Sequence, residues 1–143
     1  EKDEAFEYGG FSFARETLNL LDNLERSKQT LENDETIKDK DTLKKLIEHI
    51  DIINKDMISI FKKNNIEPIK AINEKLDPNL HQAMMEVEDD TKDHGTIVQE
   101  IQKGFMMKDR LLRPSLVAVS KKKVEDKQNN QKNQENQEKE AKN

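Results

Sequence analysis

The chain contains no cysteine and no tryptophan, and it has only one tyrosine, three prolines and four glycines among its 143 residues. Without cysteine it can form neither a disulfide framework nor a thiolate metal site. Aromatic residues make up 4% and hydrophobic residues 32% of the chain, against 38% charged residues. This composition favours long solvated helices or disordered segments over one large globular core.

Membrane-spanning and export signals are also missing. No apolar run approaches the roughly 18 residues that a transmembrane helix requires, and no signal-peptide pattern is visible. A soluble protein of the reducing cytoplasm, without a membrane partner, is therefore expected. Because the sequence begins with Glu1 and not with methionine, it is consistent with a piece of a longer protein.

The net charge of -5 is unevenly placed along the chain. Seven of the 25 basic residues and five of the 30 acidic residues lie from Lys121 onward, so residues 1–120 keep 18 basic and 25 acidic residues, a net charge of -7. An acidic body lacks the basic face that phosphate backbones require, so no nucleic-acid partner is predicted. Residues 121–143, with one β-branched and no aromatic side chain, are predicted to be a disordered tail.

Two stretches have the apolar spacing of amphipathic helices. Residues 1 to about 32 are predicted as a helix weakened at Gly9-Gly10, because two interior glycines together cost about 2 kcal/mol relative to alanine. The polar residues 32–40 are expected to form a loop in which Asp39 or Asp41 caps the next helix. That second helix is predicted over residues 41–64.

The apolar stripes of these two helices are too extensive for one antiparallel pair to cover completely. A homodimer whose four helices form a bundle would bury them, and residues 1–65 are therefore the predicted dimerisation region. The residues expected at the dimer interface are Leu18, Leu21, Leu43, Leu46, Ile50, Ile53 and Met57.

Residues 66–120 have the pattern of a small β domain. Short apolar runs alternate with turn signals such as Asp77-Pro78-Asn79 and Lys103-Gly104. The predicted fold class is therefore α+β, with long helices in a dimeric coiled coil or four-helix bundle followed by a small all-β domain. The expected strands are residues 83–87, 97–101, 105–107 and 116–119.

No combination of residues indicates covalent catalysis. The three histidines lack metal-ligand spacing, and Ser115 and Ser120 have neither a neighbouring base nor elbow glycines. His81 is expected to hydrogen-bond the backbone of the Asp77-Pro78-Asn79 turn. We predict no enzyme activity, no metal and no cofactor.

A protein-binding surface is expected in the second half of the β domain. Two arginines flank a pair of leucines there, and guanidinium groups beside aliphatic side chains are typical of protein interfaces, although a solvated surface pair has the same pattern. In each methionine pair, 84–85 and 106–107, one side chain is expected to point inward and one outward. The candidate contacts are Arg110, Arg113, Leu116, Val119 and Met107.

The runs LNLLDNLERS, LDPNLHQAM, VEDD and IQKGFMMKDRLLRPSLVAVS resemble the GrpE family, the nucleotide exchange factors of the DnaK chaperone. The resemblance covers about residues 11–120. Its most specific motifs are DPN followed by His81 and Ala83, and QKGF followed by DRLLRP. One departure is His49, which stands where the family usually has a glycine.

The resemblance implies a dimer with a long helix upstream of its bundle and no covalent chemistry. It also implies that the β domain binds the DnaK ATPase domain with its two lobes opened, so that ADP is released, and that the candidate arginines lie in the domain that meets DnaK. The alternative is a coiled-coil scaffold or adaptor without exchange activity, which would share the helices but leave nucleotide release unchanged.

Overall fold

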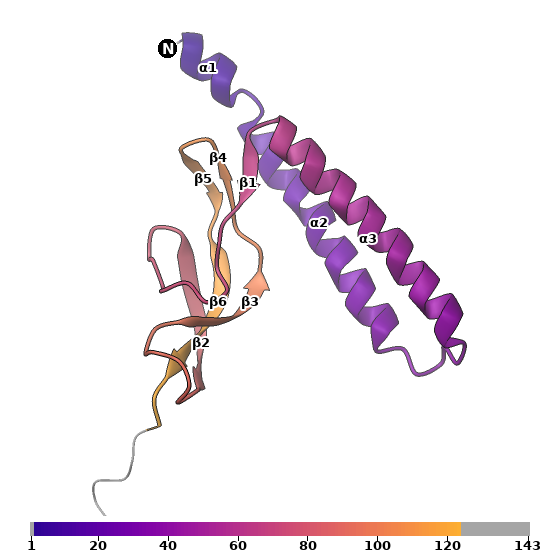
Figure 1. The fold of residues 1–143 in the computed structure, drawn as a ribbon. Coiled ribbons are helices and arrows are strands. Elements are labelled where there is room, and N and C mark those ends of the chain that lie inside the picture. The colour runs from indigo at the N-terminus through magenta and orange to yellow at the C-terminus, as the bar shows by residue number, and fades with distance from the viewer. Residues whose placement is uncertain (1, 124–143) are drawn as a thin grey trace, which may run out of the picture.

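The computed structural model describes residues 2–123, which form a helix hairpin and two small sheets (Figure 1). The expected α+β fold class is confirmed, while the part of the predicted tail from residue 124 onward lies outside the described residues. The elements in chain order are α1 (Lys2–Tyr8), α2 (Phe11–Glu32), α3 (Lys40–Lys63), β1 (Ile66–Pro68), β2 (His81–Glu88), β3 (Ile97–Gln102), β4 (Phe105–Met107), β5 (Arg110–Arg113) and β6 (Ser115–Lys121).

A break between α1 and α2 replaces the continuous helix that the family resemblance implies. Gly9 and Gly10 form a turn at this point. A Cβ atom on Gly9 would lie 2.8 Å from the carbonyl oxygen of Ala5, so the turn depends on the missing side chain. The single helix predicted over residues 1 to about 32 is thus two helices, and the break falls at the glycines that were expected to weaken it, because glycine is a poor helix former.

The start of α3 follows the predicted capping chemistry. The Asp39 side chain accepts hydrogen bonds from the backbone N–H groups of Asp41 at 3.1 Å and Thr42 at 3.3 Å. These bonds, together with the stronger one from the Thr42 hydroxyl, hold the pKa of Asp39 below its usual value. At the other end the chain leaves through Asn65 with a φ of 60°, a left-handed conformation that asparagine tolerates.

The strands form two three-stranded sheets. In the inner sheet the order is β1-β4-β5 and both pairs are antiparallel. In the outer sheet the order is β2-β6-β3, with β2 parallel and β3 antiparallel to β6. The sequence patterns predict neither β1 nor β5 as a strand, because each has only three or four residues and gains its order from pairing with β4.

Two hydrophobic clusters stabilise the chain. The first joins the helix hairpin to the inner sheet, where Leu18 of α2 is fully buried and the rings of Phe61 and Phe105 meet edge to face at 5.9 Å. The second packs Ala71, from the segment after β1, against Ile97, Val117 and Val119 of the outer sheet. The helices therefore share a core with the inner sheet and not with the outer one.

The chain crosses between the two sheets at Gly104 and Ser115. The N–H of Gly104 donates to the Ser115 hydroxyl at 3.0 Å, and its carbonyl accepts from the N–H of Ile69 at 2.9 Å. A Cβ atom on Gly104 would lie 2.3 Å from the Ser115 nitrogen, so only glycine fits this crossing. The Ser115 hydroxyl also bonds the carboxylate of Glu100, which gives this serine a structural role.

His81 is buried and hydrogen-bonds the backbone of the Asp77-Pro78-Asn79 turn, as predicted. Its Nδ1 accepts a hydrogen bond from the N–H of Asp77 at 3.0 Å, and its Nε2 lies 2.7 Å from the carbonyl oxygen of Lys70. Because the Asp77 N–H can only donate, Nδ1 is unprotonated and Nε2 carries the hydrogen. The ring thus joins the turn before β2 to the segment that follows β1.

We expect His81→Phe to destabilise the chain by roughly 1–3 kcal/mol, because the N–H of Asp77 and the carbonyl of Lys70, which bond the buried ring in a part-buried setting, would lose their partner. Chemical unfolding at a fixed protein concentration measures the effect. His94→Phe is the matched control, since His94 is exposed. A loss of stability no larger than that of the control would contradict the assigned role.

A second prediction concerns Glu100, whose pKa is raised by burial, against the opposing effects of Lys103, Ser115 and His81. A carboxyl group with a raised folded-state pKa contributes most to stability below the ordinary carboxyl pKa, and this contribution is lost as the pH rises through the raised value. Glu100→Gln should therefore raise the melting temperature at neutral pH and lose this advantage in acid. Melting curves of the native chain and Glu100→Gln at neutral and acidic pH test this prediction, and Glu86→Gln, at an exposed position, is the control. If Glu100→Gln raised the melting temperature equally at both pH values, the prediction would be wrong.

Candidate partner-binding surface

Within residues 2–123, no group of three or more His, Cys, Asp or Glu side chains is arranged to hold a metal ion. No helix of this part of the chain is long and apolar enough to cross a membrane. A residue that contacts another protein must expose its side chain, and the predicted contact residues differ in this respect.

Arg110 is exposed at the start of β5. It follows a turn in which Lys108 has a φ of 52°. Its guanidinium group lies 5.0 Å from the ring centroids of both Tyr8 and Phe11. Such cation–π contacts contribute about 0.5–1 kcal/mol each at exposed sites. The arginine is thus held beside the break between α1 and α2 while remaining open to a partner.

Arg113 is occupied within the chain. Its two terminal nitrogens donate to the two carboxylate oxygens of Asp22, each at 2.6 Å, and its Nε donates to the carbonyl of Lys103 at 2.7 Å. The guanidinium group also lies 5.7 Å from the centroid of the Phe105 ring. The sequence pattern predicts no role for Asp22, because it does not indicate that two residues 91 positions apart form an ion pair.

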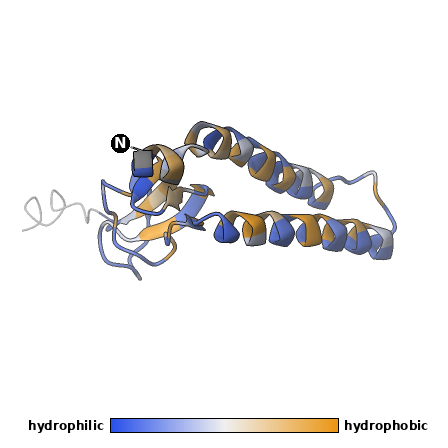
Figure 2. Ribbon diagram, turned by 90° about the horizontal axis from the view of Figure 1, so that it is seen from above, coloured by the Kyte–Doolittle hydropathy of each residue, from blue (hydrophilic) through white to orange (hydrophobic). Residues whose placement is uncertain are grey.

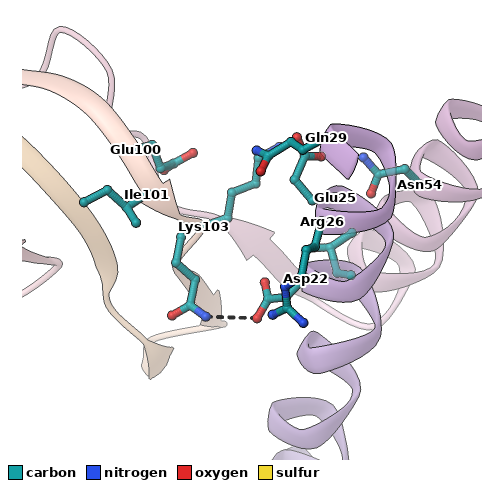
Figure 3. Close-up of a pocket in the computed structure, with 10 residues that line it drawn as sticks. Asp22, Glu25, Arg26, Gln29, Asn54, Glu100, Ile101 and Lys103 are labelled. Carbon is teal, nitrogen blue, oxygen red and sulfur yellow. Dashed lines mark hydrogen bonds between the residues drawn. The ribbon is translucent and has the colours of Figure 1, made fainter. Parts of the chain in front are cut away.

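A cleft of about 220 Å³ lies beside this pair, between the helices and the end of β3 (Figure 3). Gln102 donates a hydrogen bond to Asp22 at 3.0 Å across it. Side chains of both charge signs line the cleft, including Glu25, Arg26 and Lys103. Such a mixed lining favours no single ligand charge, and the cleft is best described as the polar edge of the seam between helix and sheet.

Leu116 is half-buried in β6, in register with Gln82 of β2 and Gln102 of β3. The predicted alternation of the first methionine pair is wrong: Met84 and Met85 are 54% and 53% exposed, because every residue of β2 after His81 is exposed. A register shift also lies between Ala83 and Met85. In the second pair Met107 is buried and Met106 is partly exposed, which agrees with the predicted alternation.

Two of the predicted contacts lie in the interior of the chain. Val119 is only 6% exposed and belongs to the outer-sheet cluster, and Met107 is buried in the cluster below the helices. Neither side chain presents a surface to a partner. Of the five predicted residues, Arg110 and Leu116 are thus the two that can be reached and are not occupied by an internal ion pair.

The residues predicted for the dimer interface also differ in how far they are buried within the single chain. Leu18, Leu21 and Leu43 are buried within the single chain, the first two in the cluster that includes the inner sheet. Ile50 and Met57 are half-buried, while Leu46 and Ile53 are exposed. The internal packing of Leu18 and Leu21 could not be predicted, since the heptad pattern does not show which partner an apolar stripe covers.

An open apolar face remains on the helix hairpin. Leu46, Ile53 and Ile60 are seven residues apart along α3 and exposed, so they lie on one side of that helix. A largely apolar cleft of about 330 Å³ between α2 and α3 continues this side, and Figure 2 shows hydrophobic positions recurring along both helices. The residues lining the cleft include Phe13, Leu20, Met57 and Ile60.

Comparison with known proteins gives consistent matches. The family model described as GrpE matches residues 1–121. Proteins named "Protein GrpE" are similar to the chain in Zymomonas mobilis, with 42% identity over 121 residues, and in Rhizorhabdus wittichii, with 40% over 121 residues. These matches cover 85% of this chain but 62% and 66% of the relatives, so the chain spans just under two thirds of their length. The chain belongs to the GrpE family.

Proposed function

We propose that the chain is a nucleotide exchange factor that binds the ATPase domain of a DnaK-type chaperone and accelerates the release of ADP. The observation that carries this proposal is the family match over residues 1–121, the range that also holds the motifs of the resemblance. The same proposal places the protein in the cytoplasm with its chaperone. A scaffold without exchange activity is the alternative outcome of the experiment below.

The proposed mechanism uses binding energy and no covalent step. If the chain binds the chaperone better when its two lobes are open, linkage requires that the open chaperone holds nucleotide correspondingly more weakly. An acceleration of about a thousandfold needs only about 4 kcal/mol of barrier reduction. An interface of ordinary size supplies this difference when a few of its contacts form only in the open arrangement.

Arg110 and Leu116 are the proposed contacts of the β domain. Arg110 is exposed and held in place by Tyr8 and Phe11, so little side-chain freedom is lost when it binds. Leu116 offers an aliphatic surface at the crossing into the outer sheet. Arg113 is assigned an internal role because its guanidinium group is already paired.

We also propose that the chain forms a homodimer through the open face of the hairpin. The exposed residues of this face lie at heptad spacing on α3 and continue into the apolar cleft with α2. A second copy would bring the same face and cover it by two-fold symmetry, which gives a four-helix bundle. Leu46, Ile53 and Ile60 are the central residues of this interface.

Replacing Ile53 by Asp should convert the dimer to a monomer at micromolar concentration, because a charge buried without a partner costs several kcal/mol. Ile53 is 51% exposed in the single chain, so the change leaves the chain's own core intact. The neighbouring Ile52→Asp is the matched control, since Ile52 is 62% exposed and lies off the open face. Light scattering measures the molar mass of the native chain and of both variants. A monomeric native chain, or equal masses for Ile53→Asp and Ile52→Asp, would exclude this interface.

The exchange activity is tested by stopped-flow release of labelled ADP from the chaperone at a subsaturating concentration of the chain. Arg110→Ala should slow release by about tenfold for each 1.4 kcal/mol of binding free energy that the substitution removes. Lys44→Ala, which removes an exposed cation from α3, should leave the rate unchanged. No acceleration by the native chain would favour a scaffold.

A further variant separates a direct contact from an indirect one. Phe11→Leu removes one of the rings that hold Arg110 but keeps the guanidinium group. If Arg110 contacts the chaperone, Phe11→Leu should slow release much less than Arg110→Ala. Equal reductions in the rate would mean that Arg110 acts only by fixing the break between α1 and α2.

A further inference from the structure

The hydrophobic cluster of the outer sheet contains no helical residue. Figure 1 shows the two sheets following one another beside the helix hairpin, and each has its own hydrophobic cluster. The chain passes between the two sheets three times: residues 69–80 join β1 to β2, and two shorter segments around residues 102–105 and 113–115 join β3 to β4 and β5 to β6. Apolar packing between helices and inner sheet therefore does not by itself fix the angle of the outer sheet.

Asp22 of α2 bonds both of the shorter segments. Its carboxylate accepts from Arg113, at the end of β5, at 2.6 Å on each oxygen, and from Gln102, at the end of β3, at 3.0 Å. Arg113 also donates to the carbonyl of Lys103, so the two segments are joined to each other. One helical side chain thus braces two of the three segments that connect the inner sheet to the outer sheet.

The geometry of the pair fixes direction as well as distance. A guanidinium group that meets a carboxylate through two parallel bonds aligns the two planes, and such charge-assisted bonds are roughly twice as strong as neutral ones. The Arg113 and Asp22 side chains are 13% and 19% exposed, so water competes little. A second ion pair between separate elements, Lys28–Asp51, is a single contact at 3.0 Å with side chains 27% and 38% exposed.

We infer that Asp22 is a positioning residue for nucleotide exchange, which holds the outer sheet at the angle to the helix hairpin that the chaperone binds. This inference rests on the proposed function. A factor that holds two lobes apart needs rigid contact surfaces, and Leu116 lies at the start of β6, three residues from Arg113. Without the brace only a fraction of molecules has the binding angle, and the apparent dissociation constant rises by the inverse of that fraction.

Asp22→Asn tests the inference, because it keeps the shape of the side chain and removes its charge. The concentration of the chain that gives half-maximal ADP release should rise about tenfold if one molecule in ten keeps the binding angle, while the plateau rate stays the same. Arg113→Lys keeps the charge but loses the paired bonds and should act in the same way. Asp51→Asn is the matched control, which removes a helical carboxylate from the exposed ion pair and should change neither quantity.

The double variant Asp22→Asn/Arg113→Lys separates a shared brace from two independent effects. Residues that act through one contact are not additive, so the double variant should raise the half-maximal concentration no further than Asp22→Asn alone. Circular dichroism and melting curves above the assay temperature must show all variants folded. If Asp22→Asn is unfolded there, Arg113→Lys decides the question.

A structural readout does not depend on the chaperone. Because the chain has no cysteine, Ser27→Cys on α2 and Glu86→Cys on β2 give two defined positions for spin labels. The distance between the two labels is measured in the presence of an excess of unlabelled chain. The native protein should give one narrow distribution of this distance, and Asp22→Asn should give a broader one.

The outcomes are distinguishable. If the native chain does not accelerate ADP release, the proposed function fails, and the spin-label distances still show whether Asp22 braces the sheet. If the native chain accelerates release but Asp22→Asn has the same half-maximal concentration, or lowers only the plateau, the positioning role is overturned. An unchanged distance distribution in Asp22→Asn would also overturn it.

Discussion

The packing of the helix hairpin on the inner sheet is the interaction on which the rest of the structure depends. Leu18 and Leu21 of α2 are buried against residues of α3, β1, β4 and β5, so one cluster joins elements from both halves of the chain. Burial of a large aliphatic side chain contributes about 1.5–3 kcal/mol. With few apolar residues available, each of these side chains serves two functions: it closes the hairpin and it orders short strands that could not form alone.

Much of this fold could be predicted from the sequence. The capped start of α3 and the hydrogen-bonding role of His81 were recognisable, because local chemistry determines them. The buried positions of Val119 and Met107 were not, since a strand pattern shows alternation but not which face is covered. The pairing of Asp22 with Arg113 depends on how distant segments meet, and no local rule contains that information.

The candidate site, too, could be predicted from the sequence only in part. Arginine beside leucine marks a surface suited to partners, yet Arg110 and Arg113, three residues apart, have opposite roles. One is held by aromatic rings near a helix break, and the other is paired with an acid on a helix. The difference arises from the approach of α2 to the crossing between the sheets, where a glycine allows two backbone segments to touch.

The register shift in β2 has a consequence for association. As one edge of the outer sheet, β2 has backbone groups that could pair with a strand from another molecule. The shift between Ala83 and Met85 interrupts the regular spacing of those groups, and the exposed Glu86 and Glu88 add charge that repels a second copy. The irregular register and the acidic side chains therefore make this exposed edge a poor template for aggregation.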